Sequence, residues 1–310
     1  MTALDFSTTI GNTWFPAPTF TASGCASSGR ELAQFFPLRE MGGVVTKSVM
    51  SKVRTGRATP RMAETPSGML NSIGLQGPGI DAFIAKDIPY LIEQKARIIV
   101  SIAGETVEEY STLARKLRSV SGISAIEVNI SCPNVENRGL VFACDPNSAR
   151  EVIEAVKRSV GNTIPIIAKL SPDVTDIVSI AREVVAAGAD GLAMINTLLG
   201  MVINTETMRP HLANKTGGLS GPAIRPVAVR AIYQVHRALP EVPIVGMGGV
   251  LTGTDAFELI LAGASAISVG TATFHDPGAP VRVKSELENI LINRGFANFS
   301  EAVGYAHRGE

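Results

Sequence analysis

The sequence predicts a (β/α)8 TIM barrel, formed as a single domain by residues 1–310. Two patterns lead to this fold class. Short apolar runs rich in β-branched residues recur eight times, and helical patterns with start and stop signals lie between them. Hydrophobic residues also make up 45% of the chain, which is enough to bury a large core. An open, doubly wound parallel sheet is the alternative, because a strand count from one sequence is imprecise.

Several of the apolar runs are nearly continuous, as in RIIVSIA and IPIIAKL, which is typical of parallel strands covered on both faces. A barrel strand meets this condition, because side chains fill the inside of the barrel and helices cover its outside. In chain order, the eight expected strands span 19–23, 44–48, 97–102, 125–131, 164–170, 191–196, 242–247 and 264–270.

Capping residues mark the starts of three expected helices. A Ser, Thr or Asp side chain at such a start accepts hydrogen bonds from the first free N–H groups of the helix. At the helix ends, Gly161, Gly188 and Gly263 suit the left-handed conformation that often terminates a helix. The expected starts and helices are Asp145 with 149–160, the segment 171–173 with 174–187, and the segment 252–255 with 256–262.

A long polar segment, residues 50–80, follows the second expected strand and is rich in Gly and Pro. In a barrel, such a loop lies on the catalytic face, where long loops usually carry function. The segment 77–82 (GPGIDA) fits the dinucleotide-binding pattern GxGxxA as text, but polar residues rather than a strand precede it. We therefore interpret 77–82 as a turn before a helix.

Charge and cysteine content exclude several classes of function. Lys and Arg together number 28, as do Asp and Glu, so no basic excess exists for a nucleic-acid backbone. Three cysteines without a CxxC pair indicate neither a disulfide framework nor an iron–sulfur or zinc site held by this chain alone. The four histidines are far apart in the sequence, so no metal site is expected.

The N-terminal sequence and the longest apolar stretch indicate where in the cell the protein is located. The first basic residue is Arg30 and no apolar run follows a basic segment, so no secretory signal is expected. The stretch 184–203 is long enough for a membrane span, but Gly188, Asp190 and Asn196 interrupt it. Together with the low cysteine count, this predicts a cytoplasmic protein that does not span a membrane.

The segment 129–134 (NISCPN) lies at the carboxyl end of the fourth expected strand, where barrel enzymes place catalytic groups. Its thiol, Cys132, is a candidate nucleophile or general base, because a free thiol with a pKa near ~8.5 needs only modest stabilisation to ionise. A buried, inert cysteine is the alternative. We interpret Cys25 and Cys144 in that second way.

Two lysines and three asparagines end or flank the expected strands. Lys47 and Lys169 follow apolar runs, and a lysine with a buried stem requires an anion or dipole beside its ammonium. We therefore expect an anionic ligand in the barrel mouth, with a solvated surface lysine as the alternative. The amides of Asn71, Asn129 and Asn196 supply both donors and acceptors, which suits a ligand with an amide edge.

Glycine-bearing segments end the last two expected strands. These are Gly248-Gly249 and Gly270-Thr271, each ahead of a helix start. In barrels, backbone N–H groups after strands seven and eight often bind a phosphate group. The sequence therefore predicts a phosphate-bearing ligand there.

These motifs together resemble the dihydroorotate dehydrogenases, and most closely their class 1B catalytic subunits, the FMN-bearing barrels of pyrimidine biosynthesis. The resemblance covers essentially the whole chain. It rests on ASG at 22–24, VTKS at 45–48, TPRMAETPSGMLNSIGLQ at 59–76, VNISCPN at 128–134, AKLSPDVTDI at 168–177, ADGLAMINTLLGM at 189–201, LANKTGGLSGPAI at 212–224, GMGG at 246–249 and VGTA at 269–272.

The resemblance implies oxidation of (S)-dihydroorotate to orotate in the de novo synthesis of UMP. Cys132 is then the base that takes the C5 proton while the C6 hydride passes to FMN, and Lys169 faces the flavin edge that gains negative charge. The residues implied to hold the substrate are Lys47, Asn71, Ser72, Ile73, Gly74, Leu75, Asn129, Asn196 and Thr197. Those implied to line FMN are Ser23, Lys47, Ser48, Asn129, Lys169, Ile195, Gly221, Gly248, Gly249, Gly270 and Thr271, with Ser101 where several relatives carry Asn.

The resemblance also implies partners. Class 1B catalytic subunits pair with an electron-transfer subunit that holds FAD and a 2Fe-2S cluster and passes electrons to NAD. This chain has neither the cysteines nor a dinucleotide motif for that task. A homodimer within a heterotetramer is therefore the expected assembly.

Other functions are open at this stage. A fumarate-linked homodimeric dihydroorotate dehydrogenase, or a reductase similar to dihydropyrimidine dehydrogenase, would use the same flavin. A lyase that forms a Schiff base on Lys169 would use no flavin, and a non-catalytic barrel would only bind a phosphate ligand. Flavin colour, the electron acceptor and borohydride trapping distinguish these alternatives.

Overall fold

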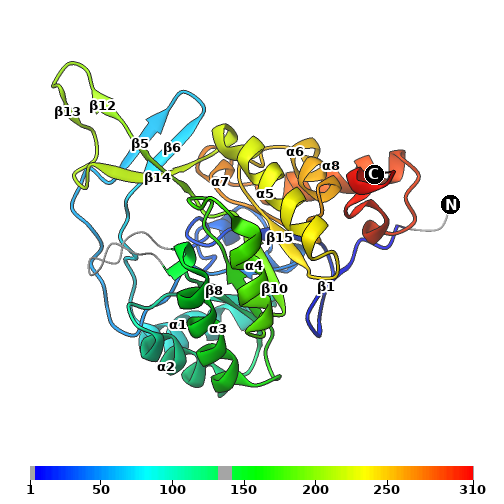
Figure 1. Cartoon of the computed structure of the whole chain (residues 1–310), viewed down its shortest axis with the longest axis horizontal. Coiled ribbons are helices and arrows are strands. Elements are labelled where there is room, and N and C mark those ends of the chain that lie inside the picture. Colours follow the sequence, from blue (N-terminus) through cyan, green and yellow to red (C-terminus); the bar gives the residue numbers. More distant parts are fainter. Residues whose placement is uncertain (1–3, 132–141, 310) are drawn as a thin grey trace.

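A computed structural model describes residues 4–131 and 142–309 of the chain (Figure 1). Eight parallel strands form one sheet in the order β3-β16-β15-β10-β9-β8-β7-β4. The two ends of this order also meet, because the N–H of Thr21 donates to the carbonyl of Gly43 at 3.1 Å. The sheet is therefore closed, and the predicted (β/α)8 barrel is confirmed. Its strands are β3 (Thr19–Thr21), β4 (Val44–Val45), β7 (Ile98–Ile102), β8 (Ile123–Asn129), β9 (Ile166–Lys169), β10 (Gly191–Met194), β15 (Ile244–Gly246) and β16 (Ala266–Val269).

Each expected strand coincides with a barrel strand, although most barrel strands are shorter than the apolar runs. The largest difference is at β4, which spans Val44–Val45 instead of 44–48. The N–H of Thr46 still donates to the carbonyl of Ile99 at 3.0 Å, but the N–H of Lys47 donates to Ser27. The chain thus departs from β7 at Lys47, which lines the cavity at the barrel mouth, before Val49 pairs with Ile102 again.

Helices surround the barrel, as Figure 1 shows. Their buried sides are apolar at helical spacing, as in α2, where Tyr110, Leu113, Ala114 and Leu117 face the protein interior. The α-helices of the described chain are α1 (Ile80–Glu93), α2 (Val107–Arg118), α3 (Pro146–Val160), α4 (Ile177–Ala186), α5 (Arg225–Ala238), α6 (Gly253–Leu261), α7 (Ala272–His275) and α8 (Ala279–Asn293). Short 3-10 helices are η1 (Leu32–Gln34), η2 (Leu38–Glu40), η3 (Phe142–Cys144), η4 (Pro222–Ile224), η5 (Phe299–Ala302) and η6 (Tyr305–His307).

Two of the three expected helix starts are confirmed. Asp145 accepts a hydrogen bond from the N–H of Ser148 at the start of α3, and Thr252 and Asp255 form a reciprocal capping box on α6. The third expected start was wrong, because α4 begins at Ile177 and its cap is Asp176. The expected turn 77–82 is confirmed only for 77–79, because α1 already begins at Ile80 with Gly79 at its N-cap.

The predicted start of α4 at 174 failed for a tertiary reason. Asp173 lies in the segment that was expected to open the helix, yet both of its carboxylate oxygens accept the N–H of Leu199 at 3.1 Å. Its own N–H donates to the hydroxyl of Ser171 at 3.1 Å. These bonds tie the segment to a distant strand and leave the cap position to Asp176.

A short hairpin, β1 (Thr8–Ile10) and β2 (Thr13–Phe15), covers the amino-terminal end of the barrel. The Thr8 hydroxyl donates to the carbonyl of Ser265, and the Thr13 hydroxyl donates to the carbonyl of Ser124; both acceptors lie at the starts of barrel strands. The hairpin residues Ile10 and Phe15 are fully buried. They pack with one residue from each barrel strand, namely Phe20, Val45, Ile99, Ala125, Ile167, Ala193, Val245 and Ala266, and with Met247.

The opposite end carries a second, antiparallel sheet in the order β11-β14-β6-β5, which projects beyond the barrel (Figure 1). The segment 50–80, which was expected to be a long loop, supplies a hairpin to this sheet. Its short strands are hard to see in a polar sequence rich in Gly and Pro. The strands are β5 (Met62–Thr65), β6 (Gly68–Asn71), β11 (Leu198–Met201) and β14 (Thr216–Ser220), and β12 (Ile203–Asn204) pairs with β13 (Arg209–Pro210) nearby.

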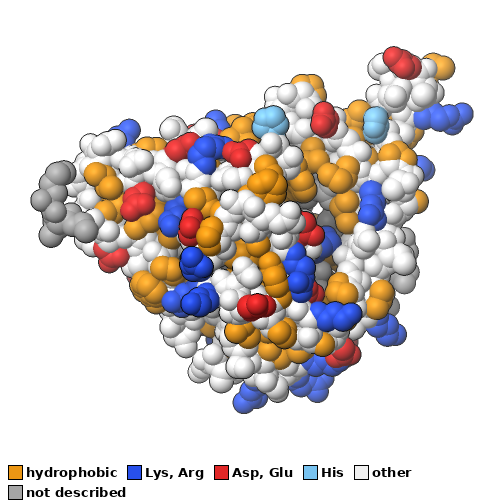
Figure 2. Space-filling model, turned by 180° about the vertical axis from the view of Figure 1, so that it is seen from behind, with side chains coloured by type: hydrophobic (Ala, Val, Ile, Leu, Met, Phe, Trp, Pro, Cys, Tyr) orange, Lys and Arg blue, Asp and Glu red, His pale blue; other side chains and the backbone are white. Residues whose placement is uncertain are grey.

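The apolar stretch 184–203 is divided among four elements, α4, β10, β11 and β12. Within residues 4–131 and 142–309, no helix is both long and apolar enough to cross a membrane. Figure 2 shows acidic and basic side chains scattered among one another over much of the face opposite to that of Figure 1.

Candidate functional site

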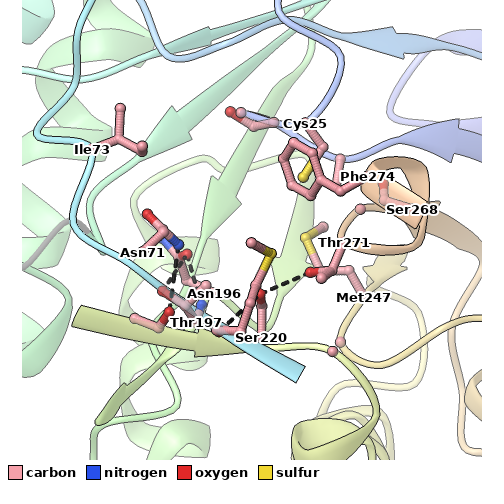
Figure 3. A pocket seen from close by; sticks show the side chains of 18 of the residues that line it. Cys25, Asn71, Ile73, Asn196, Thr197, Ser220, Met247, Ser268, Thr271 and Phe274 are labelled. Carbon is pink, nitrogen blue, oxygen red and sulfur yellow. Dashed lines mark hydrogen bonds between the residues drawn. The ribbon is translucent and has the colours of Figure 1, made fainter. Parts of the chain in front are cut away.

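A cavity of about 380 Å³ lies at the mouth of the barrel, between the carboxyl ends of the barrel strands and the antiparallel sheet (Figure 3). This volume lies in the range of small-molecule sites. Most of the ligand residues that the sequence pattern or the family resemblance predicted line this one cavity, although they come from segments up to about 250 residues apart. They are Ser23, Lys47, Ser48, Asn71, Ile73, Gly74, Leu75, Asn129, Lys169, Ile195, Asn196, Thr197, Gly221, Gly248, Gly249, Gly270 and Thr271.

Three predicted residues are not on the described cavity wall. Cys132 lies outside the described residues. Ser72 is buried, with its N–H bonded to the carbonyl of Arg61 at 2.8 Å. Ser101 is fully buried behind the wall, where its hydroxyl lies 2.9 Å from that of Ser48. The ligand-binding roles of all the predicted residues, these three included, stay predictions.

A buried ion pair lies at the base of the cavity. The ammonium of Lys169 is 3.6 Å from Oε1 of Glu127, and both side chains are at most 5% exposed. The sequence argument was that a buried Lys169 needs an anionic ligand. That argument was incomplete, because the protein itself supplies an anion in Glu127. Only Lys169 of the pair lines the cavity.

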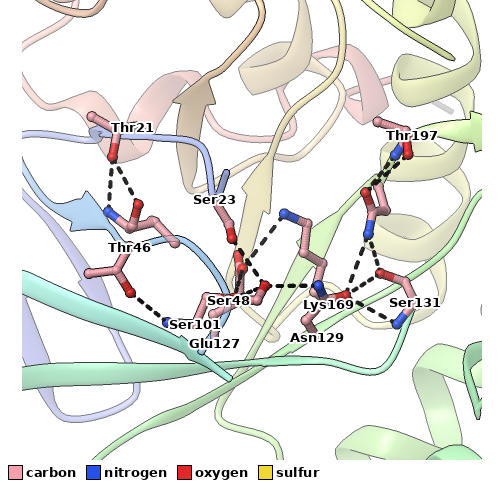
Figure 4. A network of polar contacts seen from close by, with 12 residues as sticks. Thr21, Ser23, Thr46, Ser48, Ser101, Glu127, Asn129, Ser131, Lys169 and Thr197 are labelled. Atoms are coloured by element: carbon pink, nitrogen blue, oxygen red, sulfur yellow. Dashed lines mark hydrogen bonds and ion pairs between the residues drawn. The ribbon is translucent and has the colours of Figure 1, made fainter. Parts of the chain in front are cut away.

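Hydroxyl groups connect this ion pair to the cavity wall (Figure 4). Ser101 donates to Oε1 of Glu127 at 2.9 Å. The Ser101 oxygen is also 2.9 Å from that of Ser48, which is in turn 3.3 Å from that of Ser23. A continuous polar chain therefore runs from Glu127 behind the wall to Ser23 on it.

A second polar cluster joins β8 to the end of β10. Asn129 donates to the Ser48 hydroxyl at 3.0 Å and accepts from the Ser131 hydroxyl at 2.8 Å. Asn196 donates to that same Ser131 oxygen at 2.5 Å and accepts the N–H of Thr197 at 2.7 Å. Asn196 also donates to the amide oxygen of Asn129 at 3.5 Å. These bonds hold both amides in fixed orientations.

The glycine segments after β15 have a backbone that only glycine adopts easily. Gly248 and Gly249 have φ of 122° and 79°, in the left-handed region. A Cβ on Gly249 would lie 2.6 Å from Cβ of Arg225, so no side chain fits there. Close approach of a ligand to the backbone is therefore possible at this wall, as the sequence predicted for a phosphate group.

Several wall residues were missed or given no ligand role from the sequence. Cys25 was interpreted as inert and buried, yet it lines the cavity. Burial raises the pKa of its thiol to about 11, although Lys169 and Lys47 act to lower it. Ser268 lines the cavity too, and its buried hydroxyl has no hydrogen-bond partner among the described residues.

A period-two pattern could have found two of the missed residues. Glu127 precedes Asn129 by two positions, and Ser268 precedes Gly270 by two, so each lies on the same face of its strand as a predicted wall residue. No comparable signal existed for Ser220, whose hydroxyl accepts from that of Thr271 at 2.8 Å, because its strand is glycine-rich.

The described residues contain no group of three or more His, Cys, Asp or Glu side chains that could hold a metal ion. The closed parallel barrel, the buried Lys169 and the amide-lined cavity at the carboxyl ends of the strands are together typical of a barrel enzyme that binds a polar small molecule.

Comparison with known proteins gives the family. Residues 5–291 match the family model described as dihydroorotate dehydrogenase, so the chain belongs to the dihydroorotate dehydrogenase family. Three similar proteins are each named dihydroorotate dehydrogenase B (NAD(+)), catalytic subunit. The protein of Desulforudis audaxviator is 50% identical over 291 residues, which are 94% of both chains. Those of Geotalea uraniireducens and Citrifermentans bemidjiense are 48% and 47% identical over 301 and 300 residues, in both cases 97% of each chain.

Proposed function

We propose that this protein is the catalytic subunit of an NAD-linked dihydroorotate dehydrogenase, which oxidises (S)-dihydroorotate to orotate in de novo pyrimidine biosynthesis. The observation that carries the proposal is the gathering of 17 predicted ligand residues around one cavity in a chain that matches such subunits almost end to end. The oxidation removes a proton from C5 and a hydride from C6 of the substrate, so it requires a base and a hydride acceptor.

FMN is the acceptor that the cavity suits. Three features of the wall fit it: the ammonium groups of Lys47 and Lys169, a glycine backbone at Gly248-Gly249 open to a phosphate, and the Ser268 hydroxyl, which has no hydrogen-bond partner in the described part of the chain. When bound, FMN supplies the hydride acceptor. The residues that would hold it are Ser23, Lys47, Ser48, Asn129, Lys169, Ile195, Gly221, Gly248, Gly249, Gly270 and Thr271, with Ser101 supporting Ser48.

The substrate is an anion with amide edges, and the other cavity residues suit such a molecule. Lys47 supplies a positive charge, and Asn71, Asn129 and Asn196 supply amide groups. The fixed orientations of Asn129 and Asn196 keep a flat ring in one position, as proton and hydride removal from neighbouring carbons requires. Thr197 and the backbone of residues 72–75 complete the proposed substrate site.

Cys132 is the proposed base for the C5 proton. Its place in the sequence supports this role, because it directly follows Ser131, which bonds to both asparagines of the polar cluster. A thiolate is a base of suitable strength near neutral pH when its surroundings stabilise it.

The proposal includes an electron-transfer partner. The similar proteins are named as catalytic subunits with NAD(+) in the name of the activity, which implies a further subunit. We propose that this partner holds FAD and a 2Fe-2S cluster, that the chain forms a homodimer within a heterotetramer, and that the assembly is cytoplasmic.

Anaerobic reduction of the purified protein by dihydroorotate tests the proposal. The protein is expected to be yellow and to bleach when dihydroorotate is added. Cys132→Ser is expected to slow bleaching roughly 10²–10⁴-fold, to shift its pH profile upward and to leave FMN bound. A colourless protein that refuses FMN under native conditions contradicts the whole proposal. Equal loss of flavin and activity in Cys132→Ser assigns that thiol a structural role instead.

The electron acceptor is tested separately. Orotate formation with NAD is expected only when the candidate iron–sulfur subunit is added to the chain. Rapid turnover with fumarate by the chain alone would instead identify a fumarate-linked enzyme, and binding of uracil in preference to orotate would identify a dihydropyrimidine reductase.

A further inference from the structure

Glu127 is a buried carboxylate without an assigned role in ligand binding. It lies on β8, its side chain is 3% exposed, and it does not line the cavity. Its Oε1 is the common point of two interactions, one with the ammonium of Lys169 at 3.6 Å and one with the hydroxyl of Ser101 at 2.9 Å. A buried charge persists only when it is paired in this way.

The carboxylate also fixes the direction of the hydroxyl chain in Figure 4. A hydroxyl has one proton to donate, and that of Ser101 goes to Glu127. Ser48 must then donate to Ser101, at 2.9 Å. The Ser48 oxygen is left to accept from Asn129 at 3.0 Å and from Ser23 at 3.3 Å. Glu127 therefore acts on the cavity wall at Lys169 and, through hydroxyl groups, at Ser23 and Ser48.

We propose that Glu127 is a positioning residue, which holds the Lys169 ammonium at the cavity wall and offsets its charge, so that a cofactor in the cavity meets less positive charge at Lys169 than an unpaired ammonium would present. The inference rests on the proposed FMN site. Reduction adds negative charge to a flavin, and a positive neighbour stabilises the reduced form. An uncompensated Lys169 would therefore raise the midpoint potential of the flavin. Glu127 keeps that potential low, which favours passage of electrons toward NAD, itself a weak oxidant.

The midpoint potential of FMN in the purified holoprotein tests this role. Glu127→Gln keeps an oxygen that accepts from Ser101 but removes the charge. It is expected to raise the potential by at least about 30 mV, which for two electrons is a tenfold change in the ratio of affinities for reduced and oxidised flavin. Glu127→Asp keeps the charge and is expected to restore most of the wild-type value.

Asp190→Asn is the matched control. Asp190 is also paired with a lysine, Lys157, at 3.0 Å, but it lies just before β10, at the amino-terminal end of the barrel. Its substitution is expected to leave the potential unchanged. An unchanged potential in Glu127→Gln, or an equal shift in Asp190→Asn, overturns the inference. If Glu127→Gln does not fold, the double variant Glu127→Gln/Lys169→Met replaces it, and its potential is expected at or below the wild-type value; a higher potential overturns the inference.

A measurement without flavin separates this inference from the proposed function. A double-mutant cycle with Glu127→Gln and Lys169→Met is followed by urea unfolding of the apoprotein. Each single variant leaves one buried charge unpaired, so each is expected to be destabilised. The unfolding equilibrium constant of the double variant is therefore expected to be at least tenfold smaller than the value predicted by adding the two single effects. Coupling without any FMN binding would leave the ion pair intact and contradict the proposed function. FMN binding without coupling and without a potential shift would support the proposed function and contradict the role of Glu127.

Discussion

The two ends of the barrel are built from the same strands but have opposite characters. Near the amino-terminal end, one residue of each strand joins an apolar cluster with the hairpin residues Ile10 and Phe15. Two positions further along, the same faces of four strands carry Lys47, Glu127, Lys169 and Ser268. One layer is apolar and closed by a hairpin, whereas the next carries charged and hydroxyl side chains and borders the cavity.

The difference shows how a single strand divides stability from function. Alternate side chains point into a barrel, so a change of two residues along a strand moves from one interior layer to the next. Apolar side chains in the closed layer stabilise the fold by burial. Polar side chains in the open layer contribute to ligand binding, and their burial without a ligand costs free energy. Substitutions at the two ends should therefore separate stability from ligand affinity.

The largest effect is expected at the closed end, from Phe15→Ala. Phe15 is fully buried and its ring centroid is 5.0 Å from that of Phe20. Removal of a buried Phe side chain typically lowers the free energy of unfolding by about 3–5 kcal/mol. Urea denaturation measures this loss, and FMN titration of the folded protein is expected to show an unchanged dissociation constant. Trp14→Ala, at a half-exposed neighbour, is the control and should cost far less. A marked loss of FMN affinity in Phe15→Ala would refute the separation of the two layers.

At the open end, Gly249→Ala is expected to cost about 1–3 kcal/mol of stability and to weaken FMN binding. Its φ is 79°, and the new Cβ would lie 2.6 Å from Cβ of Arg225. Gly161→Ala is the control, because Gly161 also has a positive φ, of 64°, but no atom of the residues that the structure describes lies within 4 Å of its Cβ position. Isothermal titration with FMN and urea denaturation measure the two effects. Equal FMN affinity in both variants would contradict the proposed contact between the backbone at Gly249 and the phosphate of FMN.

A smaller effect on FMN affinity is expected from the loss of one hydroxyl group, which is tested by comparison of two hydroxyl groups at opposite ends of the barrel. Those of Ser268 and Thr19 are both buried without a hydrogen-bond partner among the described residues. Ser268→Ala is expected to leave apoprotein stability unchanged or raised, and to weaken FMN binding by about 1 kcal/mol if the ligand uses that hydroxyl. Thr19→Val is expected to raise stability without any effect on FMN. If both variants bind FMN with the affinity of the wild type, the Ser268 hydroxyl forms no hydrogen bond with FMN.

The smallest effect concerns the thiol of Cys25. Burial raises its pKa to about 11, so at pH 7 nearly all of it is protonated. We expect slow alkylation by iodoacetamide at pH 7 in the apoprotein, and a rate that rises about tenfold per pH unit toward pH 11. Because the folded pKa lies above the ordinary thiol value of 9.0, this group also makes stability fall as the pH rises from about 9 to 11. Peptide mapping by mass spectrometry follows the alkylation, with Cys25→Ala as the blank. Rapid modification at pH 7 would contradict the raised pKa.

The barrel itself was predictable from the sequence because its signals are local and repeated. All eight apolar runs became barrel strands, and the positive φ of Gly161, Gly188 and Gly263 followed from their places at helix ends. The antiparallel sheet was not predicted, because its pairing depends on contacts between segments about 150 residues apart, such as Leu70 with Leu219.

The candidate site was predictable to the extent that residues stand at strand ends. Lys47, Lys169 and Asn129 were found in this way, and the cavity brings them together. Ion pairing was not predictable, because Glu127 and Lys169 lie on different strands and only the barrel geometry places them 3.6 Å apart. The start of α4 was missed for the same reason, since Asp173 is bonded to Leu199.

The sheet above the mouth has a consequence for exchange of parts between related enzymes. β14 is paired with β6 on one side and with β11 on the other. The antiparallel sheet is thus formed by two segments of the chain, 62–71 and 198–220, which are joined by the pairing of β14 with β6. A chimera that takes only one of these segments from a relative would leave β14 and β6 mismatched. Both segments of the antiparallel sheet therefore have to be exchanged together.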